Sequence, residues 1–153
     1  MKVVSTNRKA RRDYSIFEVI DSGVVLRGNE VKSLRTKNCS LDDSFGRIEN
    51  NELFLYNMHI PEFEKSSYFK SDPKRVRKLL VHKRELKRLI GLTLQKGYTL
   101  IPLKVYFNER GIAKIELALA KGKQIHDKRK KIRDDIVKRE TERSLKRFYK
   151  KRR

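Results

Sequence analysis

The sequence predicts a mainly β protein, a small antiparallel barrel followed by a basic C-terminal tail. Before residue 120, apolar and polar residues alternate along several short segments, which is the period of a half-buried strand. Beyond that point charge accumulates: residues 121–153 hold 16 Lys and Arg against 5 Asp and Glu, whereas residues 1–120 hold 24 against 14. We therefore divide the chain into a domain of residues 1–120 and a tail of residues 121–153.

The first predicted pair of strands follows a basic N-terminal segment. Tyr14–Ile20 and Gly23–Leu26 are rich in β-forming residues. They flank Asp21-Ser22-Gly23, a sequence typical of turns. We expect a turn at these three residues.

The second predicted pair is a tight hairpin. Phe45–Ile48 and Leu53–Tyr56 flank Asn50-Asn51. Asparagine tolerates the positive φ that a short hairpin turn requires. This pair is therefore expected to be antiparallel and adjacent in the sheet.

The third pair is the clearest hairpin in the sequence. Ile101–Phe107 and Ala113–Leu119 both alternate apolar with other residues, and Asn108–Gly111 separates them. Proline cannot donate to a sheet, so Pro102 is expected at an edge or a bulge. The short run Leu79-Leu80-Val81 predicts a further strand.

Two helices are expected between the strands. Asn29–Leu34 predicts a short helix with Asn29 as its N-cap, and His82–Lys96 predicts a longer one ended by Gly97. Their inward-facing residues are expected to be Val31, Leu34, Leu86, Leu89, Ile90 and Leu94. About six short antiparallel strands with two to three helices favour an OB-like barrel, which removes most sheet edges in about 100 residues and commonly binds nucleic acid.

Charge indicates the kind of partner. The chain has 40 Lys and Arg against 19 Asp and Glu, a net charge of +21, and a polyanion would offset the resulting repulsion. There is no apolar run of about 18 residues and no signal-peptide pattern, so we expect a cytoplasmic protein that does not enter a membrane. The single Cys39 has no disulfide partner and is expected to be buried or half-buried.

The tail has the charge spacing of a helix and little else to support one. Four acidic residues precede a Lys or Arg by four positions, and each such pair stabilises a helix by about 0.2–0.5 kcal/mol. The apolar residues between Ile125 and Phe148 are few and widely spaced. A helix without tertiary packing is marginal in water. We therefore expect a tail that is largely disordered when free and helical when bound to RNA.

Catalytic chemistry is not indicated. His59, His82 and His126 are scattered, and none has a Cys or His three or four residues away. Side chains of the adjacent Asp42-Asp43 would point to opposite faces of a strand, so a turn or a helix N-terminus explains them better. We predict no enzymatic activity, no metal and no cofactor. A metal-dependent nuclease stays as an alternative.

Basic clusters lie close to aromatic residues, as in proteins that bind RNA. Arg8–Arg12 precedes Tyr14, and Lys74–Lys78 follows Tyr68 and Phe69. Basic residues can position a phosphate backbone, while rings can stack on unpaired bases. Three other rings lie within predicted strands and are expected in the core: Phe17, Phe54 and Phe107.

Five segments then combine into one pattern. They are Asn7-Arg8-Lys9-Ala10-Arg11 with Tyr14, Gly28–Arg35, Ser40–Phe45, Asp72–Leu80, and Ala118–Lys123 with His126–Arg129. In this order they resemble the SmpB family (small protein B, or SsrA-binding protein) of bacteria. The resemblance covers the chain from about Asn7 through the tail.

The resemblance implies a function in the rescue of stalled ribosomes. Members of this family have an OB-like barrel that binds the tRNA-like domain of transfer-messenger RNA (tmRNA). The protein is then expected to be a monomer when free and to have three kinds of partner. The first is tmRNA. The second is the ribosome, chiefly the small-subunit rRNA at the decoding centre and mRNA channel. The third is elongation factor Tu–GTP, which is reached indirectly through alanyl-tmRNA.

The resemblance also implies which residues act. The family's RNA-contacting positions fall on Asn7, Asp21 and Leu80, and basic residues of the matched segments are expected to join them: Arg8, Lys9, Arg11, Lys32 and Lys78. In the tail, the family's decoding-centre segment falls on His126, Asp127, Lys128 and Arg129. Basic residues farther along are expected to contact rRNA: Lys131, Arg133, Lys138 and Arg139. The alternative of another class is a structural ribosomal protein with a basic extension.

Overall fold

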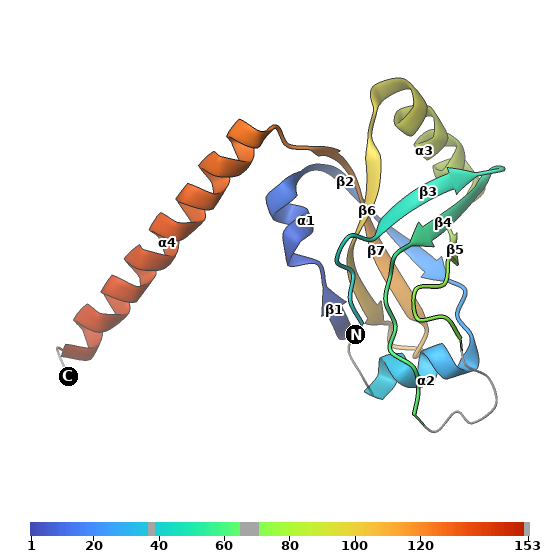
Figure 1. Ribbon diagram of the computed structural model, residues 1–153, viewed down its shortest axis with the longest axis horizontal. Helices are drawn as coiled ribbons and strands as arrows, with labels where there is room; N and C mark the ends of the chain where they lie inside the picture. Colours follow the sequence, from blue (N-terminus) through green and yellow to red (C-terminus); the bar gives the residue numbers. More distant parts are fainter. Residues whose placement is uncertain (37–38, 65–70, 152–153) are drawn as a thin grey trace. The chain divides into compact units, whose positions relative to one another are not determined.

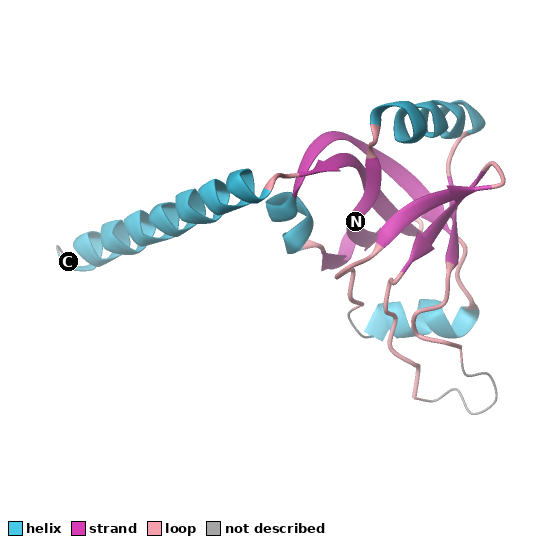
Figure 2. Cartoon of the chain, turned by 45° about the horizontal axis from the view of Figure 1, so that its top comes forward, coloured by secondary structure: helices cyan, strands magenta, loops and turns pink. Residues whose placement is uncertain are grey.

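The computed structural model describes residues 1–36, 39–64 and 71–151, with the backbone alone at 125–128 and 148–151. The chain forms two compact units, Met1–Lys121 and Gly122–Arg153. The first contains seven strands and three helices, and a single long helix makes up most of the second (Figures 1 and 2). The elements in order are β1 (Lys2–Thr6), α1 (Arg8–Asp13), β2 (Tyr14–Val24), α2 (Gly28–Thr36), β3 (Phe45–Glu49), β4 (Glu52–Tyr56), β5 (Arg77–Leu80), α3 (Lys83–Lys96), β6 (Thr99–Phe107), β7 (Ala113–Gly122) and α4 (Ile125–Lys151).

The seven strands form one sheet that closes on itself. Their order is β1-β6-β3-β4-β5-β2-β7, and an additional pairing of β6 with β7 completes the ring (Figure 1). β6 is the strand at this junction: it pairs with β7 along its length, with β3 at Leu100 and with β1 from Lys104 to Phe107. The prediction of a mainly β, OB-like antiparallel barrel is confirmed. Closure leaves few open strand edges.

Two predicted hairpins are confirmed. Asn50 and Asn51 connect β3 to β4 with φ angles of 49° and 58°, as a tight turn requires. β6 and β7 pair from Thr99 with Ala120 to Phe107 with Ala113, and their register shifts after Pro102, so the proline lies at a bulge. The signals that predict both hairpins lie within the hairpins themselves.

Gly46 allows β3 to approach β6. A Cβ atom at this position would lie 2.9 Å from the Cβ of Leu100, the residue with which it pairs. Real Cβ atoms do not approach so closely, so a side chain here would push the two strands apart. The absence of a side chain at Gly46 therefore allows β3 to pair with β6.

The turn predicted at Asp21-Ser22-Gly23 is wrong. These residues lie inside β2, which continues from Tyr14 to Val24. The Ser22 hydroxyl is buried and donates to the carbonyl of Ile115 at 2.9 Å, while Gly23 pairs with Leu80 of β5. Partners distant in sequence therefore override a local preference for turning.

The two predicted helices are present, with differences at their ends. Helix α2 begins at Gly28, so Asn29 is not its N-cap; the Arg27 carbonyl accepts from the Val31 amide at 3.1 Å, which makes Arg27 the cap. Glu30 accepts from the Arg27 amide at 2.8 Å, which is half of a capping box. Helix α3 ends at Gly97, as predicted, with φ at 63°.

Two elements at the N-terminus were not predicted. β1 is a five-residue strand whose exposed side chains give it no marked alternation. Helix α1 has six residues, of which Ala10 alone is buried, so its sequence shows no apolar face. Both are held by contacts with β6, more than 90 residues later.

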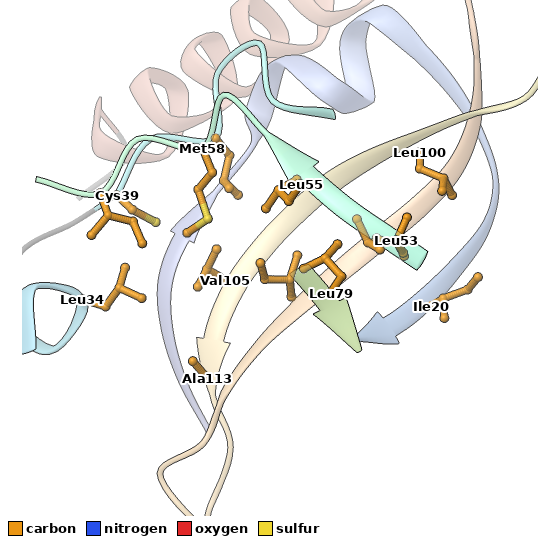
Figure 3. Packing of buried hydrophobic residues seen from close by; sticks show 14 of the residues in the cluster. Ile20, Leu34, Cys39, Leu53, Leu55, Met58, Leu79, Leu100, Val105 and Ala113 are labelled. Atoms are coloured by element: carbon orange, nitrogen blue, oxygen red, sulfur yellow. The ribbon is translucent and has the colours of Figure 1, made fainter. Parts of the chain in front are cut away.

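The barrel interior holds one main apolar cluster, part of which is shown in Figure 3. It includes Cys39, buried as predicted, and side chains from strands around the ring. Of the residues expected to face inward, Leu94 is 79% exposed and lies outside it. Of the rings expected in the core, Phe107 is buried but Phe17 is 65% exposed.

A buried ion-paired network joins α2 to β5. Arg77 has no exposed side-chain surface, and its guanidinium donates to Glu30 Oε1 at 3.0 Å and to the carbonyls of Met58, Pro73 and Arg75 at 2.6–3.0 Å. Glu30 also accepts from Arg75 Nη2 at 2.6 Å. Burial raises the pKa of Glu30, but hydrogen bonds from Arg75 and the Arg27 amide, with the charge of Arg77, outweigh it and place that pKa below its ordinary 4.5.

Replacing Glu30 by Gln is expected to lower the free energy of unfolding by about 3–5 kcal/mol at pH 7, because Arg77 would stay buried without a counter-charge. Urea unfolding of the variant and the parent measures this loss. Since the pKa of Glu30 is depressed in the folded chain, its contribution is complete above pH 4.5 and disappears as the pH falls through the folded value. The free energies of unfolding of the variant and the parent should therefore become equal in acid. A constant difference down to pH 2 would contradict this assignment.

Candidate nucleic-acid interface

Helix α1 presents the first group of predicted residues. Asn7 caps it, with Oδ1 accepting from the Ala10 amide at 3.0 Å and Nδ2 donating to the carbonyls of Leu41 and Pro102 at 3.2 and 3.1 Å. Its side chain is buried, so these three bonds occupy it inside the fold. The basic residues that follow it in the helix are exposed: Arg8, Lys9 and Arg11. Asn7 thus fixes the backbone from which three cations extend.

The far end of β2 carries the second group. Asp21 is exposed and accepts from the Tyr106 hydroxyl at 2.9 Å. Two residues on, Gly23 pairs with Leu80 of β5, and a Cβ at Gly23 would lie 3.2 Å from the Cβ of Leu80. Directly paired residues point to the same side of a sheet, so Asp21 and Leu80 share the outward face. Leu80 is 51% exposed, and Lys78, two residues earlier in β5, pairs with Glu52 on β4.

The structure thus gathers the predicted residues of the barrel into two groups and leaves one apart. Strand β2 connects the groups, because it begins directly after α1 and reaches β5 at its other end (Figure 1). Between Tyr14 and Gly23 an extended strand such as β2 measures about 30 Å along its backbone. Lys32 is exposed on α2 and belongs to neither group.

One predicted basic cluster is largely structural. In the run Lys74–Lys78, Arg77 is buried and Arg75 pairs with Glu30, so neither presents a free cation to a phosphate. The run as a whole was expected to be a basic cluster able to position a phosphate backbone, and for Arg75 and Arg77 that expectation is wrong. The reason is Glu30, a buried carboxylate 47 residues before Arg77, which requires guanidinium partners. Tyr68 and Phe69 lie outside the described residues.

The tail residues lie on helix α4. Arg129, Arg133, Lys138 and Arg139 are exposed and Lys131 is partly so. The backbone of His126, Asp127 and Lys128 is helical, and their side chains lie outside the described part of the chain. The apolar residues Ile132, Ile136, Val137 and Leu145 are each at least 42% exposed. The helix therefore presents basic and apolar side chains alike to solvent.

Within the described residues we find no group of three or more His, Cys, Asp or Glu side chains that could hold a metal ion. Burial raises the pKa of the Cys39 thiol to about 11, so it is not an activated nucleophile. Asp43 has φ at 58° and lies in a turn with Asp42, as predicted. Nor does any described helix have the length and apolar character needed to cross a bilayer.

Comparison with known proteins identifies the family. Residues 4–147 match the family described as SmpB protein. The chain belongs to the SmpB family. A protein of Pelotomaculum thermopropionicum named SsrA-binding protein is 56% identical over 146 residues, which are 95% of each chain. The SsrA-binding protein of Thermosipho africanus is 48% identical over the full length of both chains.

A solved structure agrees with this assignment. It is described as "tmRNA-SmpB: a journey to the center of the bacterial ribosome", and one of its chains is 51% identical to this one, with a TM-score of 0.68. The match covers 85% of this chain and 94% of that one. Similarity therefore extends over the barrel and most of the tail.

Replacing Asn7 by Ala is expected to lower the free energy of unfolding by about 2–4 kcal/mol, because the cap of α1 is lost and the carbonyls of Leu41 and Pro102 each lose one of the hydrogen bonds that they accept. Chemical denaturation measures the loss. An Asn7→Ser variant is the matched control for the cap, since serine is also a preferred N-cap residue and lacks the amide group that donates to the two carbonyls. A loss below about 0.5 kcal/mol for Asn7→Ala would contradict the role assigned to this side chain.

Proposed function

We propose that this protein binds the tRNA-like domain of tmRNA and delivers that RNA to stalled ribosomes for trans-translation. The observation that carries the proposal is the similarity to the SmpB chain of a tmRNA–SmpB ribosome structure, 51% identical over 85% of this chain. The net charge of +21 supports it, because a factor that bridges two RNAs must approach two polyanions.

The barrel is the part that holds tmRNA. Arg8, Lys9 and Arg11 can neutralise phosphates at one end of β2. At its other end, the carboxylate of Asp21 can accept from a ribose 2′-hydroxyl, a group that DNA lacks, and the exposed Leu80 can contact a base or sugar. Lys78 and Lys32 add charge. Asn7 acts by positioning α1, because its own polar atoms are bonded inside the fold.

The tail is the part that contacts the ribosome. Its 16 Lys and Arg residues suit the vacant mRNA channel, because they can neutralise phosphates of the rRNA beside it. His126 can stack on an exposed base at the decoding centre, and Lys128 and Arg129 can pair with phosphates beside it. An mRNA already in the channel would compete for the same space. The tail would therefore distinguish an empty channel from an occupied one.

The remaining features of the proposal concern partners and place. The protein acts by binding, without catalysis, metal or cofactor, and elongation factor Tu–GTP joins through the alanyl end of tmRNA. It works as a monomer in the cytoplasm, where ribosomes are. The similarity to SsrA-binding proteins over nearly the whole chain favours this function over that of a structural ribosomal protein.

A chain that ends at Gly122, so that β7 stays complete, is expected to bind the tRNA-like domain of tmRNA within about threefold of the full-length affinity. Because the barrel forms a compact unit without the tail, its RNA surface stays intact. The same chain should not support peptide tagging on stalled ribosomes in a reconstituted translation system. Failure of the full-length protein to bind this RNA, or normal tagging by the shortened chain, would refute the proposal.

A peptide of residues 121–153 is expected to show little helical circular dichroism in dilute buffer and to gain helicity when tRNA or rRNA fragments are added. A helix with no apolar face in contact with a core is marginal in water, and phosphates remove its charge repulsion. Raising the salt concentration should reverse the gain, because counterions displace the contacts. Strong helicity of the free peptide, unchanged by RNA, would contradict this expectation.

A further inference from the structure

An aromatic pair with a cation lies on the outer surface of the barrel. The ring of Phe17 lies 5.2 Å from that of Tyr98, centroid to centroid, with the planes inclined by 42°. The ammonium of Lys121 is 4.7 Å from the centroid of the Tyr98 ring. Phe17 lies in β2, Tyr98 directly precedes β6 and Lys121 is near the end of β7, and all three belong to the barrel unit.

Phe17 is exposed where the sequence pattern predicts burial. It retains 65% of its accessible surface, and Val19, two residues later on the same face of β2, retains 47%. Leaving a large ring and a valine this exposed, side by side, forgoes part of the free energy that their burial would supply. Adjacent exposed apolar side chains offer a surface on which a partner can pack.

The position of this surface indicates RNA as the partner. Outward side chains alternate along β2, so Phe17, Val19 and Asp21 form one row, with Phe17 and Asp21 about 13 Å apart. The row begins beside the basic helix α1 and ends beside Leu80. Along β2 it therefore lies between the two groups of proposed tmRNA contacts, where an RNA that touches both groups can reach it.

The local chemistry fits an unpaired nucleotide. A nucleobase can stack on an exposed ring whatever its identity, because every base has a π-face. An ammonium has three donors, so Lys121 can keep its contact with Tyr98 and also donate to a phosphate oxygen. The strand that bears Phe17 is fixed by its neighbour Glu18, whose carboxylate accepts from both terminal nitrogens of Arg88 at 2.6 and 2.7 Å. The ring is thus pre-positioned.

We infer that Phe17, supported by Tyr98, is a stacking site for an unpaired base of the bound RNA, and that Lys121 holds the adjoining phosphate. This inference rests on the proposed function, since it places a further contact within the same RNA surface. Stacking contributes affinity without selecting a base. The site therefore adds binding strength between the two groups of proposed tmRNA contacts.

The test is the affinity of the full-length chain for a transcript of the tRNA-like domain of tmRNA, measured at several KCl concentrations. Phe17→Ala and Phe17→Leu should weaken binding roughly 5- to 150-fold with the same salt slope, because a stacked ring is lost and no phosphate contact is. Phe17→Tyr, which keeps a ring, should bind within about threefold of the parent. Lys121→Gln should lower the salt slope by about one.

Ile112→Ala is the matched control, because Ile112 is an exposed apolar residue, 53% accessible, in the turn between β6 and β7. Parent-like affinity of Phe17→Ala while the parent binds tightly would overturn the stacking site and leave the proposed function standing. Failure of the parent to bind the transcript would overturn the proposed function and the site with it. A change in self-association of Phe17→Ala by sedimentation velocity, with RNA affinity unaltered, would show instead that the surface binds protein.

Discussion

A guanidinium that has lost all contact with water must have each of its donors satisfied, and this requirement organises one end of the barrel. Arg77 donates to Glu30 and to carbonyls of three surrounding residues, so it holds α2, the loop after residue 71 and the connection after β4 in one arrangement. The same arrangement fixes the start of β5, and with it the pairing of Leu80 with Gly23. The buried Arg77–Glu30 network therefore positions the proposed RNA surface near Asp21 from inside the fold. A buried ion pair need not add net stability compared with apolar residues, but removing one partner is costly, so the network fixes geometry more surely than it adds free energy.

The features that could be predicted from sequence are those whose causes lie within a few residues. The Asn50-Asn51 turn and the alternation across the β6–β7 hairpin are local, and both are found as expected. The turn expected at Asp21-Ser22-Gly23 failed because β5 and β7 pair with β2 there, and neither partner is visible in a window of ten residues. β1 and α1 escaped prediction for the related reason that they are too short and too exposed to carry an apolar period, and β6 stabilises both from a distance.

The candidate site shows the same division. That Arg8, Lys9 and Arg11 are exposed follows from their residue type, since long cations are almost never fully buried without a partner. That Arg77 is the exception follows from Glu30, which the sequence places 47 residues away and gives no sign of burying. Phe17 is the converse case. Its place in a predicted strand suggested the core, yet the inward face of β2 belongs to its neighbours Ile16, Glu18 and Ile20. Apolar residues occupy both faces of this strand, because Val19 shares the outward face with Phe17, so alternation alone does not identify which face is buried.

Barrel and tail meet the same physical problem, an excess of positive charge, in opposite ways. The barrel has a core that offsets the repulsion among its cations, so the proposed RNA surface would be formed before RNA binds, and little free energy of binding would be spent on ordering. The tail holds 16 of the 40 basic residues and exposes Ile132, Ile136, Val137 and Leu145. If its helix depends on phosphates, as its composition predicts, the cost of ordering is subtracted from its affinity for any RNA. Tight binding by the barrel and conditional binding by the tail are then separable. A factor built this way can carry its RNA continuously while responding to a ribosome only where enough phosphate surrounds the tail.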